Sequence, residues 1–223
     1  MTSVVRRAVA NPGQRMTRPE PGAAAEPATR VRKAPGERRE EILEEASRIA
    51  LAEGLERITL REVAAGLGVR PGLIGHYFPV VGELVGEAFA RAVSRERDRL
   101  FVASGAPRAR LAEFVARVES VEARALGRLW LNARHLARFQ PALAEAIAQQ
   151  EGLDEDRLTA LIEAGNAAGE FAAADPRAAC IRIWMAVDGL GAYANSPAVL
   201  EEPAYGGFVA DVCGWTLGLR SPL

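Results

Sequence analysis

The chain has 223 residues, 49% of them hydrophobic and 6% aromatic, and a formal net charge of −1 at pH 7. This length is sufficient for one or two domains with a buried core. This composition favours helices over sheets, and with neither a signal-peptide core nor an apolar run of about 18 residues it predicts a cytoplasmic protein without a membrane segment. Two histidines and two cysteines without metal-like spacing, and no nucleophile elbow, P-loop or dinucleotide fingerprint, predict no metal, cofactor or enzymatic activity.

Residues 1–36 are predicted to form a disordered basic arm. They are rich in Pro, Gly, Ala and Arg and show no periodicity. Residues 1–39 contain nine cationic side chains and three glutamates, so the arm could lie along DNA phosphates or enter a minor groove. The alternatives are an unselected tail, or a true start at Met16.

Residues 37–53 are predicted to form the first helix, which ends at Gly54. Their apolar residues share one helical stripe. The stripe consists of Ile42, Leu43, Ala46, Ile49 and Ala50. Residues 40–90 carry four arginines against nine glutamates, an unusual balance for a surface that approaches phosphates.

Residues 59–78 have the pattern of a helix-turn-helix. Thr59 is a good N-cap for a first helix, Gly68 can end that helix in the left-handed conformation, and Pro71 suits the first turn of a second helix. Apolar residues fall where two crossed helices need a shared core: Val63, Leu67, Val69, Ile74 and Tyr77, with the small Ala64 at the crossing. This pattern predicts a DNA-binding domain over residues 37–82, with an ordinary helical hairpin as the alternative.

Residues 37–90 resemble the TetR family of one-component transcriptional repressors. The resemblance rests on the Gly54…Thr59 spacing, Val63-Ala64, Gly68-Val69, Gly72-Leu-Ile-Gly-His-Tyr-Phe-Pro79 and Glu83-Leu84. The Gly72–Phe78 segment looks closest to the choline-responsive BetI-like branch. The resemblance implies a homodimeric repressor of a double-stranded palindromic operator, released when a small-molecule effector binds.

The predicted DNA-binding face lies on the second helix of the motif and at the start of the first. It comprises Thr59, Arg61, Arg70, Pro71, Gly72, Leu73, His76 and Tyr77. Arg70 departs from the family, which more often has a small hydroxyl residue there, and arginine could read a guanine or hold a phosphate. A second departure is Val80-Val81, where the family commonly has a phosphate-binding lysine.

Residues 83–223 are predicted to form a helical effector-binding and dimerisation domain, which completes an all-α fold behind the N-terminal three-helix helix-turn-helix domain. After a helix ending near residue 103, helices are expected at 107–120, 122–138, 140–151, 154–168, 176–194 and 204–219. A candidate ligand pocket comprises Trp130, Ala133, Phe171, Trp184, Met185 and Asp188. The alternative for each residue is an ordinary position in the core.

The last predicted helix has apolar residues on more than one face. One face can meet the rest of the chain, so the second should meet a partner subunit. The predicted dimerisation residues are Phe208, Val212, Trp215 and Leu219. The alternative is a degenerate relative that kept the helical domain of residues 83–223 and acts as a ligand-binding or interaction protein with weak DNA binding. This alternative stays open because the helix-turn-helix domain of residues 37–82, called the head below, is acidic and lacks the lysine.

Overall fold

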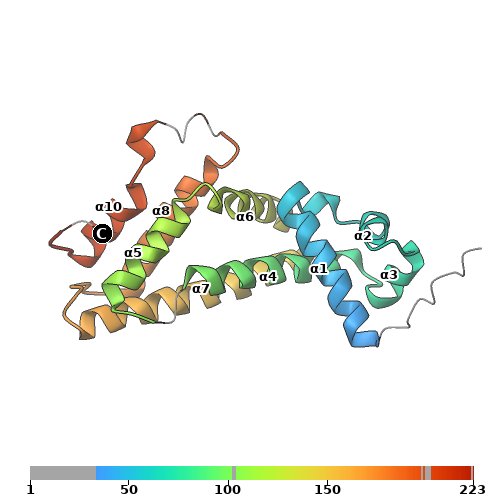
Figure 1. Ribbon diagram of the computed structural model, residues 1–223, viewed down its shortest axis with the longest axis horizontal. Helices are drawn as coiled ribbons and strands as arrows, with labels where there is room; N and C mark the ends of the chain where they lie inside the picture. The colour runs from blue at the N-terminus through green and yellow to red at the C-terminus, as the bar shows by residue number, and fades with distance from the viewer. Residues whose placement is uncertain (1–33, 102–103, 197, 199–201, 222) are drawn as a thin grey trace, which may run out of the picture. The chain divides into compact units, whose positions relative to one another are not determined.

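The computed structural model describes residues 34–223 apart from 102–103, 197, 199–201 and 222 (Figure 1). Regular secondary structure in this part is helical throughout. The elements are α1 (Pro35–Glu53), η1 (Leu55–Arg57), α2 (Leu60–Gly66), α3 (Pro71–Tyr77), α4 (Val81–Leu100), α5 (Pro107–Val118), α6 (Ala123–Ala137), α7 (Pro141–Ala167), α8 (Pro176–Ala192), η2 (Pro203–Tyr205) and α10 (Phe208–Leu217). None of these helices is both long and apolar enough to cross a bilayer. Residues 1–33 of the predicted arm lie outside the described residues, whereas Ala34 caps α1 and Pro35 and Gly36 begin it.

The helix-turn-helix forms as its sequence predicts. The Thr59 hydroxyl accepts a hydrogen bond from the Glu62 amide at 3.0 Å and caps α2. Gly68 has φ of +61°, the left-handed conformation that turns the chain between the two helices. Pro71 occupies the first turn of α3, and the fully buried Ile74 holds α3 against its neighbours.

The expected break between helices at 140–151 and 154–168 is wrong, because α7 runs without interruption from Pro141 to Ala167. Gly152 lies between the two expected helices, but a single glycine costs a helix only about 1 kcal/mol. Ile147, Asp154 and Leu158 lie on both sides of Gly152 and are all buried, so tertiary packing keeps this helix continuous. The final helix is also shorter than expected, because Gly207 and Gly218 adopt left-handed conformations beside its two ends.

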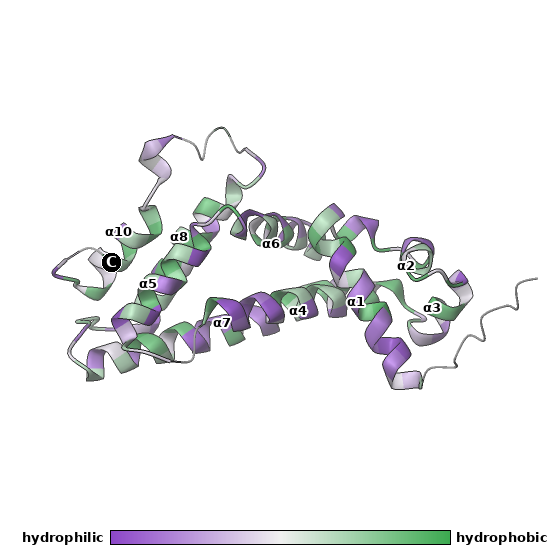
Figure 2. Ribbon diagram, viewed as in Figure 1, coloured by the Kyte–Doolittle hydropathy of each residue, from purple (hydrophilic) through white to green (hydrophobic). Residues whose placement is uncertain are grey.

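The described residues bury two hydrophobic cores. The first joins the helix-turn-helix to α4 and continues into Leu129 and Ala133 of α6 and Leu143 and Ile147 of α7. The second lies among α5, the later part of α7, α8 and α10. The first core includes residues on both sides of residue 83, so packing is continuous across the predicted domain boundary. Figure 2 shows mainly hydrophobic residues along α10, in contrast to α1, where hydrophilic residues are prominent.

Gly165 lies in close contact with Phe171 in the second core, so adding one methyl group there should lower the stability of the protein. A Cβ at this position would lie 1.9 Å from Cδ2 of the buried Phe171 ring, so Gly165→Ala should cost about 1–3 kcal/mol of unfolding free energy. Gly66→Ala is the control, because the three atoms nearest to its Cβ would all belong to the flexible Glu45 side chain. We expect that variant to stay within about 1 kcal/mol of the parent. Urea unfolding compares the two variants, and equal stabilities would contradict the packing argument.

Candidate nucleic-acid interface and ligand pocket

The predicted DNA-binding residues lie together on α2 and α3, two helices at one end of the described part (Figure 1). Six of them have exposed side chains or backbone: Thr59, Arg61, Arg70, Pro71, Gly72 and His76. Leu73 and Tyr77 are half-buried, and Tyr77 packs against the first core while its ring meets His76 edge-on at 5.3 Å. Among the described residues, neither Arg61 nor Arg70 forms an ion pair, so both guanidinium groups can meet a phosphate or a base.

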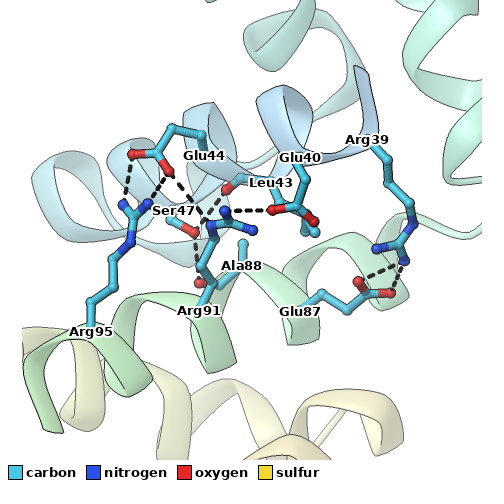
Figure 3. Close-up of polar contacts among 9 residues, drawn as sticks. All are labelled: Arg39, Glu40, Leu43, Glu44, Ser47, Glu87, Ala88, Arg91 and Arg95. Atoms are coloured by element: carbon cyan, nitrogen blue, oxygen red, sulfur yellow. Dashed lines mark hydrogen bonds and ion pairs between the residues drawn. The ribbon is translucent and has the colours of Figure 1, made fainter. Parts of the chain in front are cut away.

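Three arginines outside residues 40–90 form ion pairs with glutamates inside that range, on α1 and α4. Figure 3 shows Arg39 paired with Glu87 at 2.7 Å, Arg91 with Glu40 at 2.6 Å, and Arg95 with Glu44. The hydrogen bond from Arg95 lowers the pKa of Glu44 below its usual range, so this carboxylate stays charged and paired. The charge count over residues 40–90 missed these partners because they lie just outside it.

The same contacts fasten α1 to α4. Besides the arginine pairs, the buried Ser47 hydroxyl donates to the Leu43 carbonyl at 2.8 Å or the Ala88 carbonyl at 3.0 Å, as Figure 3 shows. Since α4 continues past the helix-turn-helix and packs along α7, movement of α4 would carry α1 with it.

A cavity of about 290 Å³ lies among α4, α6, α7 and α8. Four of the predicted ligand-binding residues line it: Trp130, Trp184, Met185 and Asp188. Ala133 and Phe171 do not line it. Ala133 is fully buried on the side of α6 that faces the helix-turn-helix, and Phe171 packs over Gly165. The apolar pattern of each segment predicted burial correctly, but it does not specify which neighbour a buried side chain meets.

The cavity wall also contains ion pairs that the sequence did not reveal. Arg134 contacts Glu151 of α7 at 3.1 Å and Asp188 of α8 at 2.9 Å, and its guanidinium lies 5.1 Å from the Trp130 ring centroid. Burial alone would lower the pKa of Arg134, but the hydrogen bonds that its guanidinium donates to Asp188 and Glu151 raise it. One arginine thus joins three helices at the cavity and occupies the face of an aromatic ring.

A second polar cluster forms a buried part of the same wall. Arg97 of α4 donates to Asp154 and, at 2.7 Å, to Oε1 of Gln150, both on α7. All three residues are buried. Burial raises the pKa of Asp154 although the hydrogen bond from Arg97 opposes the shift. The sequence contained one signal for this cluster. Gln150 and Asp154 are four residues apart, which places them on the helical face of α7 that also carries its buried apolar residues.

The helical fold agrees with known proteins. A sequence model described as the tetracyclin repressor-like C-terminal domain matches residues 104–191. The structure superposes on a TetR-family regulator from Rhodococcus sp. with a TM-score of 0.66 and 21% identity, covering 83% of this chain and 100% of that one. The chain has the TetR fold.

Two further solved structures share this TetR fold. A transcriptional regulator from Pseudomonas aeruginosa PAO1 has a TM-score of 0.64 and 24% identity, covering 84% of this chain and 92% of that chain. A regulator from Saccharomonospora viridis in complex with choline has a TM-score of 0.60 and 21% identity, covering 81% and 94%. Comparison with curated protein sequences gives no match. These neighbours do not single out the BetI-like branch, which stays a prediction.

Proposed function

We propose that the protein is a TetR-family DNA-binding transcriptional regulator, acting as a homodimeric repressor that leaves a palindromic operator when a small molecule fills the cavity. The observation that carries this proposal is one packed unit with an exposed α3 in a helix-turn-helix and a partly open cavity beside α4 and α6. An effector that binds better in the operator-free arrangement would shift the population away from DNA, and DNA would in turn weaken effector binding.

The dimer proposal rests on exposed apolar side chains along α8 and α10. Ile181 and Met185 of α8 and Phe208 and Trp215 of α10 are large hydrophobic residues on the surface. The two helices pack against each other, so these side chains can form one self-complementary patch. Val212 and Leu219 are partly buried against the second core and would lie beside that patch. A twofold axis there would present two α3 helices to half-sites about 34 Å apart.

The effector proposed for the cavity is a small, mostly apolar molecule. A volume of about 290 Å³ is near the lower end for ligand pockets, and most of the lining residues are apolar. Choline, the ligand of the S. viridis neighbour, would have to compete here with Arg134 for the Trp130 ring. We therefore do not extend choline recognition to this chain.

The decisive test is fluorescence anisotropy of the purified protein with DNA from its own upstream region and a scrambled control, across a salt series. Specific binding that weakens steeply with salt supports an autoregulating DNA-binding protein. Equal, weak binding to both DNAs calls for selection from random sequences. Failure of that selection would contradict DNA recognition and favour the alternative, a helical ligand-binding protein whose exposed Val81 replaces a phosphate contact.

Arg70 should decide part of the operator sequence. Arg70→Ala is expected to reduce the preference for operator over scrambled DNA by about 1–3 kcal/mol, because a bidentate guanine contact would be lost. Arg61→Ala is the matched control and should weaken binding to both DNAs alike, lowering the salt slope by about one unit. If Arg70→Ala behaves like Arg61→Ala in the same anisotropy titrations, Arg70 holds a phosphate instead.

A further inference from the structure

Two faces of helix α6 make different contacts. Gly127, Trp130, Leu131 and Arg134 line the cavity, whereas Leu129 and Ala133 are buried in the first core with the helix-turn-helix. The same short helix therefore touches the proposed effector and the proposed DNA-binding domain. A displacement of α6 by a ligand must change its packing against the head, because close-packed side chains do not absorb such movement freely.

Asn132 makes a specific polar contact from α6 to the head. Its Oδ1 accepts a hydrogen bond from the Leu55 amide at 2.9 Å, and its Nδ2 donates to Oε1 of Glu56 at 2.6 Å. Leu55 begins η1, the turn that leads from α1 through the buried Ile58 to the Thr59 cap of α2. The amide bonded by Asn132 thus lies four residues before the helix-turn-helix begins.

The geometry of α6 favours movement of its C-terminal half, which carries Asn132. Near the start of α6, a Cβ on Gly127 would lie 3.2 Å from Gly191 Cα, so α6 and α8 already touch there through their backbones. Asn132 lies five residues further on, about 7.5 Å along the helix and midway between Trp130 and Arg134. A molecule that displaces Arg134 from Glu151 and Asp188 would free this end of α6 while the Gly127 crossing acts as the pivot.

We propose that Asn132 is the positioning residue that transmits occupancy of the cavity to the start of the helix-turn-helix. The proposal rests on the proposed function, since it assigns the route by which the effector acts on the DNA-binding head. When α6 shifts, the Leu55 amide either follows Asn132 or loses its acceptor. In both cases η1 and the Thr59 cap change position relative to the rest of the head.

The test fills the cavity covalently, so that no effector needs to be known. Val187 lines the cavity from α8 and is half-buried, and Val187→Cys can be modified with N-phenylmaleimide. Cys180 and Cys213 are fully buried, and burial raises the pKa of both thiols, that of Cys213 to about 12, so they should react slowly. Leu153→Cys is the control site, because Leu153 is 48% exposed on α7 and does not line the cavity.

The readout is hydrogen–deuterium exchange of peptides covering residues 54–60. The adduct at position 187 should change the exchange rate there about fivefold or more when Asn132 is present, a ratio at the lower end of allosteric coupling. The adduct at position 153 should leave it unchanged. In Asn132→Ala the response to the adduct at position 187 should disappear. An unchanged response in Asn132→Ala, or no response with Asn132 present, would overturn the proposal.

A rescue variant separates coupling from simple destabilisation. The double variant Asn132→Asp with Glu56→Gln can restore both hydrogen bonds, because the new carboxylate accepts from the Leu55 amide and from the new side-chain amide. This variant should recover the exchange response, and failure to recover it in a folded protein would contradict the positioning role.

DNA anisotropy is measured on the same samples. Exchange coupling in a protein that binds neither the upstream DNA nor any sequence selected from a random pool would support Asn132 and overturn the proposed function. DNA binding with equal exchange responses in the parent and Asn132→Ala would overturn the role of Asn132 alone.

Discussion

Asp154→Ala is expected to lower the free energy of unfolding by about 3–5 kcal/mol, because Arg97 would keep its charge in the interior without its partner. The Arg97 side chain is 4% exposed and that of Asp154 is 11% exposed. Arg97 also donates to the side chain and the carbonyl of Gln150, so it cannot swing out to water without breaking those bonds. Urea unfolding followed by circular dichroism measures the loss.

Two further variants make the Asp154 result specific. Asp156→Ala changes an exposed carboxylate on the same helix and should stay within about 0.5 kcal/mol of the parent. Arg97→Met with Asp154→Leu removes both charges and should recover most of the lost stability, since a buried pair can be replaced by apolar residues at little cost. If Asp154→Ala were as stable as Asp156→Ala, the ion pair would not be buried in solution.

Local signals predicted the helix-turn-helix part of the fold well. Thr59, Gly68 and Pro71 act through backbone conformation and capping within a few residues, so their effect can be read from a short window. The expected break between residues 151 and 154 was wrong, because buried residues on both sides of Gly152 keep α7 continuous. Capping residues, glycine and proline predict helix boundaries reliably where no tertiary contact opposes them.

Long-range partners could not be predicted from the sequence in the same way. Glu44 pairs with Arg91 and Arg95 of another helix, and a count of charges along the chain cannot show which of them meet. Asn132 and Arg134 are two polar residues in an otherwise ordinary amphipathic helix, yet one contacts the head and the other joins α7 and α8. Their partners depend on how the helices pack, which the helical period does not specify.

Trp215→Glu is expected to convert the proposed dimer into a monomer. The Trp215 side chain is 74% exposed on α10, and exposed tryptophans at a subunit interface commonly contribute 2 kcal/mol or more. A twofold interface contains the residue twice, so the variant should weaken dimerisation by about 4 kcal/mol, or roughly a thousandfold. Sedimentation equilibrium over a range of protein concentrations measures this change.

Phe139→Glu provides the matched control for dimerisation. Phe139 is 70% exposed and aromatic, but it follows α6 and lies outside α8 and α10. The control should retain the parent's oligomeric state, which separates loss of a specific interface from a general effect of added charge. Operator affinity should fall with the dimer, because a monomer contacts one half-site and loses the effective concentration that links the second α3 to the first. Equal sedimentation of the two variants would place the subunit interface elsewhere on the surface.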